Sequence, residues 1–137
     1  MVKRVAHIAI AVPSVEEAAK FYTQRLGLKL TGTETVPHRR VRVGFIEGGG
    51  VKIELVQPEA DDAPIAKFLR ERGPGLHHIC FEVSDVEAEF VHLKTSGVKI
   101  VDATPQVGAG GTKTFFIHPK STGGVLIELN QPASGQE

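Results

Sequence analysis

The chain has 137 residues, of which 41% are hydrophobic and 23% charged, values typical of a single soluble globular domain. Sixteen basic residues balance sixteen acidic ones, so the composition favours neither a nucleic-acid partner nor a membrane partner. The single cysteine, Cys80, excludes an internal disulfide and indicates a reducing compartment. The N-terminal apolar run is too short and too alternating for a signal peptide or a membrane span. We therefore expect an unprocessed cytoplasmic protein with a disordered tail at residues 133–137.

The first half of the chain predicts the element order β-α-β-β-β. An alternating apolar pattern predicts a strand at residues 6–12. Ser14 and Glu17 have the spacing of a capping box, which predicts that a helix begins there. Gly27 stands where a left-handed residue would end that helix. Three more strands are expected at residues 29–33, 41–47 and 51–57.

A short helix is expected to connect this half to a second half of the same kind. It runs from Pro64 to about Arg72, with proline in its first turn, and a Gly-Pro-Gly turn follows it. In the second half, Ser84 and Glu87 have the capping-box spacing, and Gly97 stands at the expected helix end. The strands of this half are expected at residues 76–83, 99–102, 113–118 and 125–130.

The two halves are copies of one module. Residues 51–58 and 125–132 are identical at six of eight positions, and the segment that begins at His7 is echoed by the segment that begins at His78. The edge strands of an open sheet have unpaired backbone N–H and C=O groups, so we expect the modules to pair about a pseudo-twofold axis. The predicted fold is α+β, with two βαβββ modules forming a curved eight-stranded mixed sheet that encloses a metal site. It is a single domain with half-modules at about 1–58 and 75–132 and a linker helix at about 63–72.

Each half carries one histidine on its first strand and one glutamate on its last strand. The apolar neighbours of each glutamate must point to the opposite face of the strand, so the glutamates face the inside of the sheet if those neighbours face the helices. Two imidazoles and two carboxylates form a donor set suited to Zn²⁺, Co²⁺, Ni²⁺, Mn²⁺ or Fe²⁺. The plainer interpretation is that the glutamates are solvated and the histidines merely tolerated. The symmetric placement favours a metal site with the ligands His7, Glu54, His78 and Glu128.

Other residues rank lower as site candidates. His77 has the opposite strand parity from His78, which favours a packed structural role. Cys80 shares the parity of His78, so it either lines the cavity or serves as a small buried hydrophobic residue. The glycine-rich segment 108–114 lacks the spacing of a phosphate loop and precedes a strand. We expect it to be either a flexible lid over the substrate or a plain hairpin.

Three motifs carry a resemblance to a known family. They are Gly-Leu-His-His-Ile at 75–79, Asp-Asp-Ala-Pro-Ile-Ala-Lys-Phe-Leu at 61–69, and His-Pro-Lys at 118–120 followed by Gly-Val-Leu-Ile-Glu-Leu at 124–129. Over nearly its whole length the chain resembles the vicinal-oxygen-chelate superfamily, which includes glyoxalase I, ring-cleaving dioxygenases and bleomycin-resistance proteins. The motifs resemble those of the methylmalonyl-CoA epimerase family in particular. Glyoxalase I tends to carry Asp-Pro-Asp-Gly before its last strand, and this chain does not.

The resemblance implies epimerisation of methylmalonyl-CoA between its (R) and (S) forms by removal and return of the C2 proton through a metal-stabilised enolate. It implies one divalent metal ion, with Co²⁺ favoured over Zn²⁺, Mn²⁺ or Ni²⁺, on the four ligand positions. Some members place a non-ligand carboxylate where this chain has Val43, and those members can carry glutamine where it has Glu54. Glu54 and Glu128 are therefore the expected catalytic bases, with Glu128 the safer assignment.

The expected partner is a small acyl-CoA substrate, and the expected assembly is a homodimer. Lys113 and Lys120 could contact the CoA phosphates, although they could equally be solvated lysines. One alternative is a glyoxalase I-type lyase that acts on a thiol–methylglyoxal hemithioacetal with the same four ligands. Another is a metal-free, drug-binding resistance protein, which four intact ligand-type residues argue against. An iron dioxygenase is disfavoured because the second glutamate would occupy the position that oxygen needs.

Overall fold

The computed structural model describes residues 1–133 and contains two compact units. The N-terminal unit spans His7–His77, and the C-terminal unit combines Met1–Ala6 with His78 and the residues after it. Residues 134–137, which belong to the predicted tail, lie outside the described part. Within residues 1–133, no helix is both long enough and apolar enough to cross a membrane.

The first module has the predicted order β-α-β-β-β. In the sheet, β1 runs parallel to β4, and β3 is antiparallel to both β4 and β2. The helix α1 continues into one π-helical turn, at residues 21–25. The elements are β1 (Val2–Ala11), α1 (Val15–Lys20), β2 (Lys29–Val36), β3 (Val41–Glu47) and β4 (Lys52–Pro58), followed by the connecting helix α2 (Pro64–Arg72).

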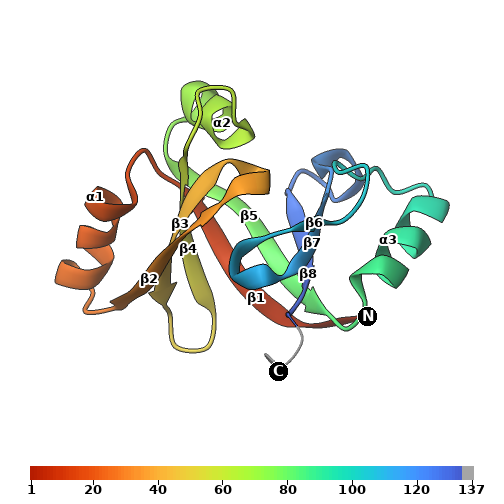
Figure 1. Ribbon diagram of the computed structural model, residues 1–137, viewed down its shortest axis with the longest axis horizontal. Coiled ribbons are helices and arrows are strands. Elements are labelled where there is room, and N and C mark those ends of the chain that lie inside the picture. The colour runs from red at the N-terminus through yellow and green to blue at the C-terminus, as the bar shows by residue number, and fades with distance from the viewer. Residues whose placement is uncertain (134–137) are drawn as a thin grey trace. The chain divides into compact units, whose positions relative to one another are not determined.

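The second module repeats this order. Its first and last strands are again parallel neighbours, and its remaining pairs are antiparallel. The elements are β5 (Gly75–Val83), α3 (Val86–Thr95), β6 (Gln106–Val107), β7 (Lys113–Ile117) and β8 (Ile127–Gln131). The eight strands form a mixed sheet in the order β2-β3-β4-β1-β5-β8-β7-β6 (Figure 1). The predicted fold class, two βαβββ modules in one eight-stranded mixed sheet, is confirmed.

One predicted strand is wrong. Residues 99–102 contribute only an isolated bridge, between Ile100 and Ile117, and the strand that pairs with β7 is β6 instead. The carboxylate of Asp102 accepts the backbone N–H of Phe116 at 2.7 Å. The side chain of Asp102 therefore binds the backbone N–H that a longer strand at residues 99–102 would have paired, and the backbone pairing with β7 ends at this point.

The helix ends follow the predicted chemistry with one shift. The hydroxyl of Ser14 accepts the N–H of Glu17 at 3.2 Å, as expected for a capping residue. In the second module the cap is Asp85, which accepts the N–H of Ala88 at 3.1 Å, and not the predicted Ser84. Aspartate and serine are about equally good capping residues, so the sequence alone could not show whether Ser84 or Asp85 caps this helix.

The glycine-rich segment 108–114 forms part of a hairpin. The backbone N–H of Gly108 donates to the carbonyl oxygen of Thr112 at 2.9 Å, and β6 and β7 flank a single 3₁₀ turn, Ala109–Gly111. The two glycines of the turn, Gly110 and Gly111, have φ values of 70° and 73°, which glycine adopts without strain. The hairpin alternative therefore describes this segment.

Each unit has its own apolar core between one face of its strands and its own helix. The helix α1 lies over β3 and β4, and α3 lies over β7 and β8 (Figure 1). The opposite face of the strands in each unit is thereby left for polar side chains. The buried core residues are Val12, Val15, Ala19, Ile46 and Leu55 in the N-terminal unit, and Val83, Val86, Phe90, Phe115, Ile117 and Leu129 in the C-terminal unit.

Candidate metal centre

The N-terminal unit brings together one of the predicted histidine–glutamate pairs. His7 lies on β1 and Glu54 on the neighbouring parallel strand β4, and the Nδ1 atom of His7 is 3.1 Å from Oε2 of Glu54. Both residues are buried, with 6% and 8% of their surface exposed. Leu55 packs in the core beneath α1, so its neighbour Glu54 must lie on the other face of β4.

The C-terminal unit contains the equivalent pair. His78 lies on β5 and Glu128 on the parallel neighbour β8, and the Nε2 atom of His78 is 2.9 Å from Oε1 of Glu128. Both residues are buried. Phe116, which is the register partner of Glu128 on β7, lies edge-on to the His78 imidazole with ring centroids 4.9 Å apart. This aromatic contact restricts the orientation of the imidazole.

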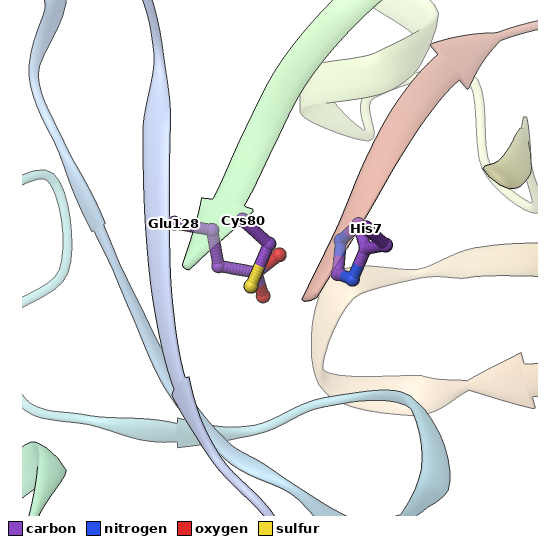
Figure 2. Close-up of side chains that lie close together, drawn as sticks. All are labelled: His7, Cys80 and Glu128. Carbon is purple, nitrogen blue, oxygen red and sulfur yellow. The ribbon is translucent and has the colours of Figure 1, made fainter. Parts of the chain in front are cut away.

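Cys80 also lies on the polar face of the C-terminal unit. It pairs in register with Glu128, and its thiol is fully buried. Figure 2 shows the side chains of Cys80 and Glu128 next to each other on the two neighbouring strands. The three residues labelled there, His7, Cys80 and Glu128, are each buried and each offer one nitrogen, sulfur or oxygen ligand atom.

The donor chemistry of these residues fits a divalent metal ion. Buried imidazoles and carboxylates are costly to remove from water unless they are paired or bind a metal. Each unit buries one of each type, in contact with each other, on the face that its core leaves free. Imidazole nitrogen together with carboxylate oxygen is the set that zinc, cobalt, nickel and manganese accept.

Val43 is the residue that the sequence resemblance matched to a non-ligand carboxylate of some family members. It is buried in β3, two residues before Phe45, and Phe45 is the register partner of Glu54. Alternate residues of a strand share a face, so Val43 lies on the same face as Glu54. An aliphatic side chain there cannot transfer a proton. The buried acid–base groups on this face are His7 and Glu54, and the half-buried Glu34 of β2, which is the register partner of Val43, lies on the same face.

The weaker site candidates, His77, Lys113 and Lys120, have contacts outside the two histidine–glutamate pairs. The ring of His77 lies edge-on to Phe68 of α2, with centroids 4.9 Å apart, which agrees with a packed role. Lys113 forms an ion pair with Glu87 at 3.5 Å. Lys120 is exposed, and its backbone N–H donates to Nδ1 of His118 at 3.0 Å.

The pKa of His118 is lowered from its ordinary value. Desolvation of the imidazole is the largest cause, and the positive charges of Lys99 and Lys120 add to it. The neutral ring is also the form whose Nδ1 can accept the hydrogen bond from Lys120. His118 therefore favours its neutral form in the folded protein.

The chain matches the model of a known superfamily. The model described as Glyoxalase/Bleomycin resistance protein/Dioxygenase superfamily matches residues 6–116, so the chain belongs to this superfamily. Human mitochondrial methylmalonyl-CoA epimerase is 41% identical over 129 residues, which cover 93% of this chain and 73% of the human protein. Within the superfamily, the chain belongs to the family of methylmalonyl-CoA epimerases, which are enzymes of the isomerase class.

Two further comparisons agree. Ethylmalonyl-CoA/methylmalonyl-CoA epimerase of Cereibacter sphaeroides is 42% identical over 134 residues, which cover 96% of this chain and 99% of that protein. The structure of a variant of Streptomyces coelicolor methylmalonyl-CoA epimerase, solved in complex with 2-nitronate-propionyl-CoA, has a TM-score of 0.91 and 31% identity. The match covers 98% of this chain and 100% of that chain. The fold and the family are therefore shared along nearly the whole length.

Proposed function

We propose that this enzyme interconverts the (R) and (S) epimers of methylmalonyl-CoA by removing and returning the proton at C2. The observation that carries the proposal is the buried histidine–glutamate pair in each module, at 3.1 Å in one and 2.9 Å in the other, on equivalent strands. Epimerisation needs a proton acceptor on one face of a flat intermediate and a proton donor on the other. The duplicated module supplies one carboxylate for each role, and relatives named for this reaction support the choice of substrate.

The two glutamates are the proposed bases. The C2 proton of methylmalonyl-CoA is acidified by the thioester carbonyl and the carboxylate that flank C2. In one direction Glu128 accepts this proton while Glu54, in its protonated form, returns one to the opposite face, and in the other direction the two exchange roles. Burial removes water that would otherwise compete for the proton. The imidazoles beside the carboxylates orient them, and Phe116 in turn restricts the ring of His78.

His7, Glu54, His78 and Glu128 are proposed to hold one divalent ion, Co²⁺ or alternatively Zn²⁺, Mn²⁺ or Ni²⁺. When bound, the ion would stabilise the negative charge that develops on the substrate oxygens during deprotonation. Each glutamate would then be both ligand and base, which requires that its carboxylate be held loosely. His7 and His78 are the permanent ligands in this proposal.

The proposal also covers the domain organisation and the oligomeric state. The half-modules at about 1–58 and 75–132 act together as one domain, because each contributes only half of the proposed ligand set. We further propose that the enzyme is a cytoplasmic homodimer. Light scattering of the purified protein measures the mass of the assembly, and a mass equal to one chain would contradict the dimer.

The decisive experiment follows solvent deuterium into C2 of methylmalonyl-CoA in D₂O. Protein reconstituted with Co²⁺ should incorporate deuterium and convert a pure epimer into the mixture, whereas protein kept in chelator should do neither. Metal-loaded protein that leaves C2 unexchanged would contradict the proposal. The same preparation is then assayed with a thiol–methylglyoxal hemithioacetal, whose turnover would establish glyoxalase-type chemistry instead.

A further inference from the structure

The C-terminal unit contains a row of three buried polar residues beside its histidine–glutamate pair. Glu82 of β5 is the register partner of Asn130 on β8, and Asn130 is the register partner of Thr114 on β7. Their exposed fractions are 6%, 9% and 1%. Asn130 is two residues beyond Glu128, so both side chains lie on the face opposite the core residue Leu129.

The N-terminal unit has an apolar row at the equivalent places. The same pairing on its strands joins residues that are buried, with 0%, 5% and 3% of their surface exposed: Ala11, Val56 and Val43. The repeated segments on β4 and β8 are identical at six of eight positions, and Val56 against Asn130 is one of the two differences. The duplication has therefore become asymmetric beside one carboxylate, by the introduction of polarity that burial alone would disfavour.

The side-chain oxygen of Asn130 lacks a hydrogen-bond partner in the described structure. Among residues 1–133, this Oδ1 atom is buried and accepts no hydrogen bond. Glu82 in the same row is compensated, because Arg4 donates from Nη2 at 2.9 Å and the ammonium of Lys3 lies 3.6 Å away. A buried acceptor without a donor destabilises the fold, so its presence calls for a ligand that supplies the donor.

The spacing between Asn130 and Glu128 indicates which donor group of the substrate would reach the Asn130 oxygen. Two residues of a strand span roughly 6.6 Å, so the backbone positions of Glu128 and Asn130 are about this far apart along β8. In an extended acyl-CoA thioester, five bonds through sulfur separate C2 from the nearest amide nitrogen of the pantetheine arm, which covers a similar length. That nitrogen carries a hydrogen, whereas the thioester and carboxylate oxygens of the substrate can only accept.

We propose that Asn130 binds the pantetheine amide nearest the sulfur, by accepting its N–H at Oδ1. This inference rests on the proposed function, because it takes the reacting carbon to lie at Glu128. Asn130 is then a specificity-determining residue: it makes the C-terminal module the side along which the CoA arm runs. The apolar row of the N-terminal module offers no such acceptor.

The variant Asn130→Val tests the contact, since it copies the residue at the equivalent position of the other module. Three substrates separate the effect: methylmalonyl-CoA, its N-acetylcysteamine thioester, which keeps the amide in question, and its butyl thioester, which lacks it. The variant should lower kcat/KM about threefold to tenfold for the first two substrates, which corresponds to the loss of one hydrogen bond. It should leave kcat/KM for the butyl thioester unchanged.

Two controls separate binding from folding. Asn130→Val removes an unpartnered buried oxygen, so its melting temperature should equal or exceed that of the native protein. The matched variant Val56→Asn should melt at a lower temperature and leave the ratio of kcat/KM between amide and butyl thioesters as it is. An Asn130→Val protein that melts lower and loses activity equally on all three substrates, or that loses none, would overturn the inference.

Calorimetric binding of the unreactive propionyl thioesters of N-acetylcysteamine and butanethiol makes the same comparison without turnover. Weaker binding of only the amide-containing thioester by Asn130→Val supports the contact. The same result from a native protein that exchanges no C2 proton would uphold the contact and overturn the epimerase proposal. Equal binding of both ligands by both proteins would overturn the contact, whatever the turnover.

Discussion

The side-chain oxygen of Gln57 accepts the backbone N–H of Val15, the first residue of α1, at 2.9 Å. The second module repeats the contact, since Gln131 accepts the N–H of Val86, the first residue of α3, at 3.0 Å. The first N–H groups of a helix have no partner within the helix, so each glutamine satisfies one of them. Each glutamine follows its module's glutamate by three residues, and the hydrogen bond links the end of that strand to the start of the helix.

Gln57→Ala and Gln131→Ala should each lower the free energy of unfolding by about 1 kcal/mol, because each leaves a helix-terminal N–H without its partner. Urea denaturation followed by circular dichroism measures the change. Gln57→Glu serves as the control, since it keeps an acceptor oxygen and adds a negative charge near a helix N-terminus. Alanine variants that unfold at the native urea concentration would refute this role.

Glu54→Gln and Glu128→Gln should each retain bound metal and reduce kcat about 10²- to 10⁴-fold, the usual contribution of a positioned acid or base. Each variant should still exchange the C2 proton of one epimer, the one that presents this proton to the remaining glutamate. NMR of each pure epimer in D₂O, with metal analysis of the same samples, measures both effects. Glu59→Gln changes an exposed carboxylate and should behave as native. Near-normal kcat with full metal occupancy in Glu54→Gln would exclude it as a base.

Metal should stabilise the fold. Free Co²⁺ at one hundred times its dissociation constant should raise the free energy of unfolding by about 2.7 kcal/mol over the chelated protein. His7→Ala and His78→Ala should each lose most of this gain, whereas His92→Ala, which changes an exposed histidine on α3, should keep it. Thermal unfolding across a metal titration provides the measurement. A gain of the same size in all three variants would place the ion elsewhere.

The lowered pKa of His118 predicts a pH dependence of stability. Since the folded protein disfavours the charged imidazole, the unfolded chain binds more protons between the lowered pKa and the ordinary value near 6.5. The contribution of His118 is therefore fully present above the ordinary value and is lost as pH falls towards the lowered one. His118→Asn keeps an acceptor for the Lys120 N–H without titrating. Urea titrations at several pH values should show a smaller loss in this variant, and equal losses would contradict the assignment.

The sequence was sufficient to predict which face each ligand-type residue occupies, because strand parity depends only on neighbours. Leu55 beside Glu54 and Leu129 beside Glu128 are apolar, and both lie in the cores beneath the helices. The module order also followed from the repeat. The strand expected at residues 99–102 was wrong because the side chain of Asp102 takes a backbone donor, a competition between partners distant in sequence that no local pattern reveals.

Which residues lie opposite one another depends on strand pairing, and this is where sequence reasoning fell short. Cys80 could be assigned to the polar face but not placed against Glu128, since that requires the register of β5 with β8. Asn130 was overlooked for a different reason. The repeat drew attention to identical positions, whereas the informative position was one at which Val56 and Asn130 differ.

The strand β1 begins in one compact unit and ends in the other, since Met1–Ala6 belong with the C-terminal unit and His7 opens the N-terminal one. Arg4, in the first part of β1, donates two hydrogen bonds to the buried carboxylate of Glu82. A fragment made of the second module alone would lack Arg4, and the unpaired buried carboxylate would destabilise it. The second module therefore depends on the first part of β1 for the cation that its buried carboxylate needs. Recombination that exchanged one module for that of another gene would need its crossover inside β1, between Ala6 and His7, as well as between the modules.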